Sequence, residues 1–248
     1  MDCRYSHHEK KVFLLESIKA CGERKDLGKA IRIHADILRW EDLNPYKKDI
    51  CIHNALISMY TKCGHLVKAQ EVFHEIPVQD VISWTTLISG YVRHGHGEQA
   101  IKGFERMQIE AILADAVMFV YVLKACGITG AVYKGKQIHA KIANMGILEK
   151  DAILGTSLVN MYARCGDLVQ AKEVLKNLSV RDLISWNALI AGYAQQGEYH
   201  EVLNCFECMQ IGGTSPDSIT FTCMLKACGC IGALDKGKQI HDEIIRNG

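Results

Sequence analysis

The stretches "VISWTTLISGYVRHGHGEQAIKGFERMQ", from Val81, and "LISWNALIAGYAQQGEYHEVLNCFECMQ", from Leu183, are two versions of one line, 102 residues apart. Neighbouring segments return at the same spacing: "NALISMYTKCGHLVKAQEVF" as "TSLVNMYARCGDLVQAKEVL", and "VLKACGITGAVYKGKQIHAKI" as "MLKACGCIGALDKGKQIHDEI". A third version of the latter, "SIKACGERKDLGKAIRIHADI", starts at Ser17. Self-similarity at a fixed period indicates an array of repeats.

Each repeat is predicted to form two helices. Apolar residues in the first half of the line from Val81 lie at i, i+3, i+4 and i+7, which is one face of a helix. Gly95 and Gly97 are expected to break this helix, and a second apolar stripe follows them. The chain has only three prolines, which favours uninterrupted helices. The two stripes consist of Trp84, Leu87, Ile88 and Tyr91, and of Ala100, Ile101, Phe104 and Met107.

The 102-residue block divides into repeat units of 31, 35 and 36 residues. One helical pair cannot bury its own apolar face, but stacked neighbours bury a continuous core. We therefore expect a single all-α solenoid of about seven helical pairs. The repeat units are placed at residues 11–49, 50–80, 81–115, 116–151, 152–182, 183–217 and 218–248. The first and last pairs lack clear capping features, which predicts a segment of a longer protein and leaves self-association through an uncapped end open.

Composition argues against nucleic-acid binding by charge alone, against a membrane span and against secretion. Lys and Arg number 29 against 28 Asp and Glu, so no basic excess is available to bind nucleic acid by charge alone. No segment offers the roughly 20 continuous apolar residues of a membrane span. The eleven cysteines mostly recur with the repeat, which is typical of small buried side chains in a reduced, intracellular protein. The N-terminal residues have the character of neither a secretion signal nor an organelle transit peptide.

The chain is not expected to be an enzyme or to hold a metal or cofactor. Cys205 and Cys208 form a CxxC with Cys223, Cys228 and Cys230 nearby, but they lie within predicted helices, and a zinc site needs four converging ligands. A deaminase would need HxE and a later PCxxC; "HHE" at 7–9 matches the first part alone. The periodic histidines, which are expected to serve packing, are His34, His139 and His241.

The repeat units closely resemble the P, S and L units of plant-type pentatricopeptide repeat proteins of the PLS class. "SWTTLISGYVRHGHGEQAIKGFERM", "NALISMYTKCGHLVKAQEVFHEIPVQD" and "VLKACGITGAVYKGKQIHA" carry the resemblance, and the order L-S-P-L-S-P-L runs from Lys11 to Gly248 without the C-terminal E and DYW extension of that class. The resemblance implies a right-handed superhelix that binds single-stranded RNA in its inner groove. It also implies about one base per repeat unit, with the first unit toward the 5′ end.

In this family the fifth and the last residue of each unit read the base. The resemblance carries that role to Asn54 with Asp80, Thr85 with Asp115, Val120 with Asp151, Thr156 with Asp182, and Asn187 with Asp217. An ionised Asp only accepts hydrogen bonds, so it favours guanine N1–H or uracil N3–H over adenine and cytosine. By the family pattern Thr with Asp reads G and Asn with Asp reads U, while Val120 has no hydrogen-bonding group. The predicted RNA core is U-G-N-G-U, 5′ to 3′.

Two further sets of residues are candidates for RNA contact. The resemblance implies that the second residue of each unit sandwiches the base, and an aliphatic side chain offers a modest, sequence-tolerant contact. The residues at this position are Ile82, Val117, Ile153 and Ile184, with Cys51 as the exception. Cations that align at the end of the first helix are expected to meet phosphates, with a shallow salt dependence. These cations are Lys62, Arg93 and Arg164, and Gln195 departs from the series.

Other interpretations stay open. A terminal Asp is also a favoured N-cap for the next helix, a role that does not exclude base contact. The aligned cations are equally explained as solvated charges. The expected function is the targeting of organelle RNA processing in the mitochondrion or chloroplast, foremost cytidine-to-uridine editing, with catalysis from a further domain or a partner protein. RNA splicing or stabilisation remains an alternative, and so does a protein–protein scaffold.

Overall fold

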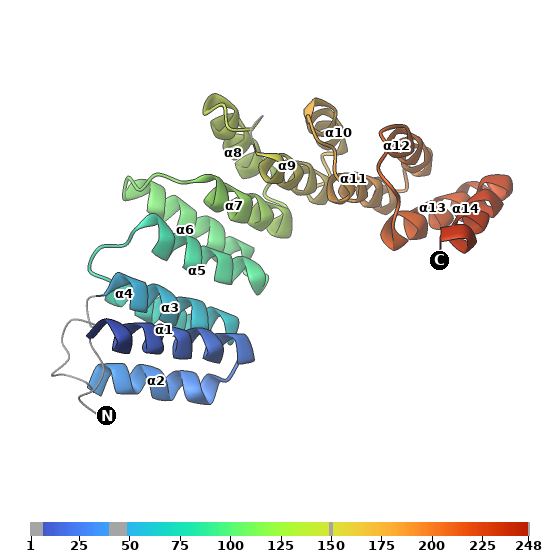
Figure 1. Cartoon of the computed structure of the whole chain (residues 1–248). Helices are drawn as coiled ribbons and strands as arrows, with labels where there is room; N and C mark the ends of the chain where they lie inside the picture. The colour runs from blue at the N-terminus through green and yellow to red at the C-terminus, as the bar shows by residue number, and fades with distance from the viewer. Residues whose placement is uncertain (1–6, 40–48, 149–150, 248) are drawn as a thin grey trace. The chain divides into compact units, whose positions relative to one another are not determined.

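The computed structural model describes residues 7–39, 49–148 and 151–247. In these ranges all fourteen regular elements are α-helices, which confirms the predicted all-α solenoid of helical pairs (Figure 1). Pro45, which is expected to mark a turn, lies outside the described residues. The chain forms two compact parts, here called the N-terminal half (residues 1–122) and the C-terminal half (residues 123–248), and each is described by itself.

The N-terminal half contains three helical pairs and the start of the next helix. Its helices are α1 (His7–Arg24), α2 (Leu27–Arg39), α3 (Ile50–Lys62), α4 (Leu66–Glu75), α5 (Val81–Arg93), α6 (Gly97–Ile109) and the beginning of α7 (Ala116–Thr129). The two helices of each pair pack against each other, and the first helices α1, α3 and α5 pack side by side. The second helices α2 and α4 also pack against the first helix of the following pair.

The C-terminal half repeats this arrangement. Its helices are the end of α7, α8 (Val132–Asn144), α9 (Ala152–Arg164), α10 (Leu168–Asn177), α11 (Leu183–Gln196), α12 (Tyr199–Ile211), α13 (Ser218–Ile231) and α14 (Leu234–Asn247). The first helices α9, α11 and α13 pack side by side, and α10, α12 and α14 each pack against the first helix of their own pair. In both halves, therefore, one layer of the stack consists of consecutive first helices.

The predicted apolar stripes form the core between these layers. All four stripe residues of α5 are buried, as are those of α6 except Ile101, which is partly exposed. Between α5 and α6, Gly95 has φ = 79°, a left-handed conformation that glycine adopts without steric cost. Gly97 is the first residue of α6 rather than part of the turn. Pro77 follows the end of α4, where it cannot continue the helix.

Two periodic histidines join neighbouring helical pairs. The Nδ1 atom of His34 lies 3.0 Å from the hydroxyl of Tyr60, and that of His139 lies 3.0 Å from the hydroxyl of Tyr162. Burial lowers the pKa of both histidines, so the neutral ring is favoured. The corresponding histidine of the last pair, His241, has a side chain that is 68% exposed. These first two histidines therefore have the packing role that their periodicity predicts.

Candidate nucleic-acid interface

The repeat-terminal aspartates stand at the start of the first helices, where each one caps the helix that follows. Backbone N–H groups of the first helical turn donate to one carboxylate oxygen, Oδ1, over 2.7–3.4 Å. Such caps satisfy donors that have no partner inside the helix. The capping role holds at Asp49, Asp80, Asp115, Asp151, Asp182 and Asp217.

In the C-terminal half, the fifth side chain of a repeat unit is hydrogen-bonded to the terminal Asp of that unit. The hydroxyl of Thr156, on α9, donates to Asp182 Oδ2 at 3.0 Å, and Asp182 caps α11. The side-chain amide of Asn187, on α11, donates from Nδ2 to Asp217 Oδ1 at 3.0 Å, and Asp217 caps α13. Because consecutive first helices pack side by side, residues about 30 positions apart in the chain become direct neighbours.

The amide of Asn187 has a second partner. Its Oδ1 atom accepts a 2.6 Å hydrogen bond from the hydroxyl of Thr220, a residue that is fully buried. The Thr220 backbone N–H lowers the pKa of the Asp217 carboxyl, and the Asn187 amide adds to this effect, while partial burial opposes it. Asp217 is therefore an ionised acceptor in the neutral range, as the base-reading hypothesis requires.

The N-terminal half holds its fifth residues differently. Asn54 Oδ1 is buried and has no hydrogen-bond partner among the described residues. The hydroxyl of Ser83, the counterpart of Thr220, donates to Asp80 Oδ1 at 2.5 Å. The hydroxyl of Thr85 donates to the backbone oxygen of Val81, one turn earlier in its own helix, at 2.6 Å. Asn54 and Asp80 stand on the packed helices α3 and α5, and the described residues of this half show no direct bond between a fifth residue and its terminal Asp.

The middle predicted pair is divided between the halves. Val120 belongs to the N-terminal half and is partly exposed. Asp151 belongs to the C-terminal half and accepts from the backbone N–H groups of Ile153 and Leu154. The surroundings of Val120 and of Asp151 are each described, and the pairing of the two residues stays a prediction.

Large aliphatic side chains stand in solvent beside the capping aspartates. The four residues expected to sandwich the bases are 53–68% exposed, although aliphatic side chains of this size are usually buried. Ile219, at the second position of the last unit, is 55% exposed and extends the series. Sequence reasoning did not assign it, although its place 35 residues after Ile184 would have identified it.

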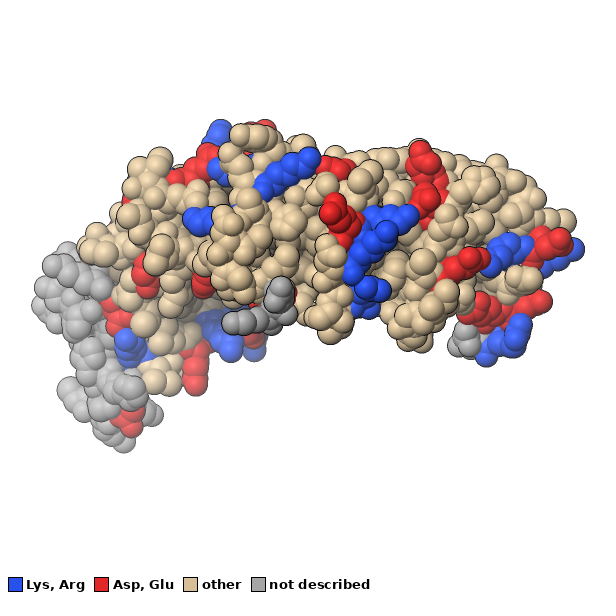
Figure 2. Space-filling model, turned by 90° about the horizontal axis from the view of Figure 1, so that it is seen from above, with Lys and Arg blue, Asp and Glu red and all other residues tan. Residues whose placement is uncertain are grey.

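The predicted phosphate-binding cations lie at the opposite ends of the first helices. Lys62 is partly buried and packs near Gly22, where an added Cβ would lie 3.2 Å from its Cδ. Arg164 is exposed, but its Nε donates to the backbone oxygen of Gly127 at 3.3 Å. Arg93 is exposed. On the face shown in Figure 2, basic and acidic side chains alternate, without one large region of either sign.

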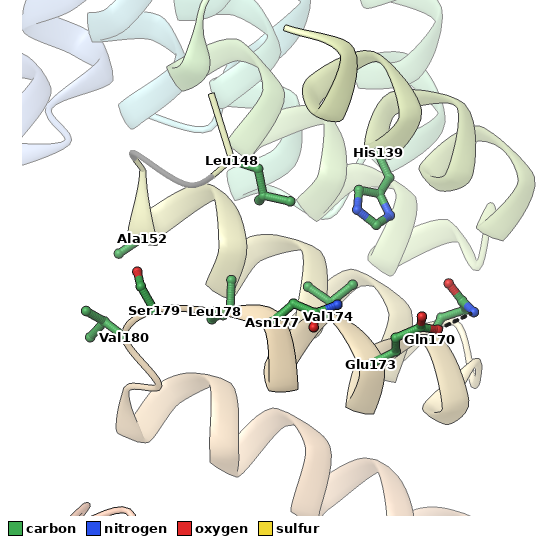
Figure 3. Close-up of a pocket in the computed structure, with 10 residues that line it drawn as sticks. All are labelled: His139, Leu148, Ala152, Gln170, Glu173, Val174, Asn177, Leu178, Ser179 and Val180. Atoms are coloured by element: carbon green, nitrogen blue, oxygen red, sulfur yellow. Dashed lines mark hydrogen bonds between the residues drawn. The ribbon is translucent and has the colours of Figure 1, made fainter. Parts of the chain in front are cut away.

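A cavity of about 260 Å³ lies among α8, α9, α10 and the segment after α10, and its lining includes Ala152, the neighbour of Asp151 and Ile153 (Figure 3). Its polar residues Gln170 and Glu173 are hydrogen-bonded to each other at 3.2 Å. It includes no predicted base-reading residue. The described residues contain no grouping of three or more metal-ligating side chains, and none of their helices is long and apolar enough to cross a bilayer.

The repeats match known protein families. Models described as "PPR repeat family" and "PPR repeat" together match residues 51–127 and 156–248. The chain belongs to the pentatricopeptide repeat family. A mitochondrial pentatricopeptide repeat-containing protein of Arabidopsis thaliana is 32% identical over 96% of this chain, and a chloroplastic one is 34% identical over 93%. The chain spans about a third of the length of these relatives, 34% and 36%.

Solved structures of this family share the fold. The crystal structure of the pentatricopeptide repeat protein PPR10 from maize matches 95% of this pentatricopeptide repeat chain with a TM-score of 0.69 and 18% identity, over 34% of its own length. PPR10 in complex with an 18-nucleotide psaJ RNA element matches 97% of the chain with a TM-score of 0.66 and 18% identity, over 40% of its own length. At this identity the likeness establishes the fold alone.

Proposed function

We propose that this chain binds single-stranded RNA base by base, as the targeting module of an organelle RNA-processing protein. The observation that carries the proposal is the bond between a fifth side chain and the Asp that caps the next first helix, as in Thr156–Asp182 and Asn187–Asp217. The Thr156 hydroxyl gives its one proton to Asp182 and keeps its oxygen as an acceptor, whereas Nδ2 of Asn187 keeps one N–H to donate. An exposed aliphatic side chain such as Ile184 lies two residues beyond each capping Asp.

The capping geometry supports selection of bases that carry a ring N–H. The backbone caps occupy Oδ1 of Asp80 and Asp115, and Oδ2 has no protein partner among the described residues. An ionised carboxylate oxygen accepts from guanine N1–H or uracil N3–H and repels the bare ring nitrogen of adenine or cytosine. With the fifth residues as the second selector, the proposed core remains U-G-N-G-U from Asn54 to Asp217. Capping and reading are thus compatible roles of one carboxylate.

The place of action is proposed from the relatives. Similar proteins are named mitochondrial or chloroplastic, which supports a role in an organelle. The L-S-P order of the repeat units supports cytidine-to-uridine editing as the process, with the reaction carried out by another domain or a recruited protein. Lys and Arg nearly balance Asp and Glu, 29 against 28, so charge alone would bind RNA weakly.

The test is fluorescence anisotropy of the chain with labelled U-G-A-G-U RNA and with an RNA in which every U and G is exchanged, each at two salt concentrations. We expect tighter binding of the first RNA and a shallow salt dependence. Thr85→Asn should change the preferred second base from G to U, by about 1–3 kcal/mol of discrimination. Thr86→Asn is the matched control: Thr86 makes the same type of backbone bond, to Ile82, but is not a fifth residue.

Three results would contradict the proposal. Equal binding of both RNAs with a steep salt dependence means attraction by charge without base selection. A preference that Thr86→Asn changes as much as Thr85→Asn removes the fifth residue from its reading role. Absence of binding to both RNAs at low salt favours the protein–protein scaffold instead.

A further inference from the structure

A buried hydroxyl fixes the direction of one predicted reading amide. Thr220 is the third residue of its repeat unit and lies on α13, one helix away from Asn187 on α11. Its Oγ1 lies 2.6 Å from Asn187 Oδ1 and 3.0 Å from Asp217 Oδ1, and it accepts from the backbone N–H of Asp217 at 3.2 Å. A hydroxyl has one proton to donate, and the shorter contact assigns that proton to Asn187.

The two bonds of the Asn187 amide allow one orientation. Oδ1 accepts from Thr220, and Nδ2 donates to Asp217 Oδ1. A rotation of the amide by 180° would place Nδ2 against the hydroxyl of Thr220 and Oδ1 against an ionised carboxylate. Asn187 as a whole is 9% exposed, so the rotated amide would lose two hydrogen bonds at a largely buried position. The second N–H of Nδ2 has no partner among the described residues and remains available to a base.

The equivalent amide in the N-terminal half has no such constraint. Ser83 occupies the place of Thr220, but its hydroxyl bonds to Asp80 Oδ1 at 2.5 Å, and its oxygen accepts from the Asp80 N–H at 3.2 Å. Asn54 Oδ1 is left without a partner among the described residues. No hydrogen bond to Oδ1 therefore holds the amide of Asn54 in one orientation.

We propose that Thr220 is a positioning residue that makes the Asn187 unit discriminate uracil from cytosine more strictly than the Asn54 unit does. Uracil presents two carbonyl oxygens that flank N3–H, and the unpartnered Nδ2–H complements a carbonyl. Cytosine presents an amino group in place of one carbonyl, and a flipped amide would accept from it. Holding the amide in one direction thus excludes the cytosine contact. This inference rests on the proposed RNA-binding function.

The experiment compares U→C substitutions at the two ends of U-G-A-G-U, with the Kd of each RNA measured for the whole chain. For the wild type, we expect the last-base substitution to weaken binding more than the first-base substitution. Thr220→Val keeps the side-chain shape but removes the hydroxyl, and should lower the last-base discrimination about five- to tenfold. The first-base discrimination should stay within about twofold. Thr220→Ser, which keeps the hydroxyl, should retain the wild-type ratio.

Ser83→Ala is the matched control in the N-terminal half, because the Ser83 hydroxyl bonds to Asp80 and not to Asn54. It should leave the first-base discrimination unchanged. Two results would overturn the inference, provided that U-G-A-G-U still binds. One is a lower first-base discrimination of U from C in Ser83→Ala, and the other is an unchanged last-base discrimination in Thr220→Val. Absence of RNA binding would instead overturn the proposed function, and this inference with it.

A second measurement needs neither RNA nor a variant. The side-chain NH₂ protons of Asn187 should exchange with solvent at least about tenfold more slowly than those of Asn54, because the amide is held at both ends. Comparable exchange of the two amides in the wild-type protein would contradict the fixed orientation, whatever the RNA result.

Discussion

Asn54 and Asn187 occupy the same position in their repeat units, and both units end in Asp, yet their amides have different partners. In the C-terminal half, Asn187 bridges Asp217 and Thr220. In the N-terminal half, Ser83 bonds to the capping Asp80 instead. The comparison teaches that the fifth and the terminal residue of a repeat unit do not by themselves define how the fifth side chain is held. The third residue of the following unit decides whether the amide is held.

The threonine units differ in the same way. Thr156 donates to Asp182 across two helices, whereas Thr85 donates to Val81 within its own helix. The third residue of the next unit is Ser185 in the first case and Met118 in the second. The Ser185 hydroxyl donates to the backbone oxygen of Asp182, which leaves the carboxylate for Thr156. The Thr85 and Thr156 units have the same fifth and terminal residues, yet only in the Thr156 unit is the fifth side chain expected to be held by the terminal Asp before RNA binds.

The largest change in unfolding free energy is expected at two equivalent glycines of first helices, Gly90 on α5 and Gly192 on α11, whose neighbours differ between the halves. A Cβ at Gly90 would lie 2.7 Å from Cβ of Thr61, a buried and β-branched side chain. A Cβ at Gly192, 102 residues later, would lie 2.6 Å from Cδ2 of Leu168, which is the end of a more flexible side chain. Gly90→Ala should therefore lower the free energy of unfolding by about 1–3 kcal/mol or more, and Gly192→Ala by less.

Urea denaturation of the two variants measures this difference. Gly229→Ala is the control, because an added Cβ there meets no atom within 4 Å and the residue lies inside α13. It should stabilise the protein by up to about 1 kcal/mol through helix propensity. Equal losses for Gly90→Ala and Gly192→Ala would mean that Thr61 yields as readily as Leu168.

An intermediate change in unfolding free energy is expected when the histidine–tyrosine contacts are removed. Tyr60→Phe removes the partner of His34, which is 4% exposed, and should cost about 1–2 kcal/mol of unfolding free energy. Tyr162→Phe should cost less, because His139 is only partly buried and water can replace the lost partner. Thermal or urea unfolding at pH 7.5 gives both values; a larger loss for Tyr162→Phe contradicts the expectation.

The same histidines predict a direction of pH dependence. Their folded pKa lies below the ordinary value of 6.5 because burial disfavours the charged ring. The unfolded chain then binds more protons as the pH falls below about 6.5, so the stabilisation present above that pH is lost through the lowered folded pKa. Urea denaturation between pH 7.5 and 5 should show this loss. A chain with His34→Gln and His139→Gln should show a shallower decline, and an identical decline assigns it to other groups.

The smallest change in unfolding free energy is expected from the fifth-position threonines, measured without RNA. Thr156→Val removes the bond to Asp182 and should cost about 0.5–1 kcal/mol. Thr85→Val removes a bond within one helical turn, which contributes little, so its change should stay within about 0.5 kcal/mol. Denaturation curves that rank the two variants in reverse would contradict the difference between the halves.

Much of the fold could be predicted because the same helical spacing of apolar residues occurs in several repeat units. The stripe from Trp84 to Tyr91 lies on one face of α5 and is buried, as its spacing indicates. Gly95 is an expected break, and α5 ends before it. The assignment of Gly97 to the break was wrong, because the first position of a helix needs no intrahelical N–H bond and tolerates glycine.

The candidate site could be predicted only in part. The capping role of every described terminal Asp follows from its place before a helix, and the structure confirms it. The different roles of Thr220 and Ser83 could not be predicted, because a hydroxyl at a third position is also a common capping-box residue. Which acceptor that hydroxyl selects depends on side chains of another helix, and no spacing rule reports it.

Sequence by itself determined the helical pairs, their order, the family and the positions of the fifth and terminal residues, because these depend on periodicity along the chain. Tertiary structure alone decided which of those residues bond to each other, since contacts such as Thr156–Asp182 and Asn187–Asp217 form between packed helices. It also decided that Thr220, and not Ser83, donates to the amide of the preceding unit. The reason is physical: a hydroxyl has a single proton, and geometry chooses its acceptor.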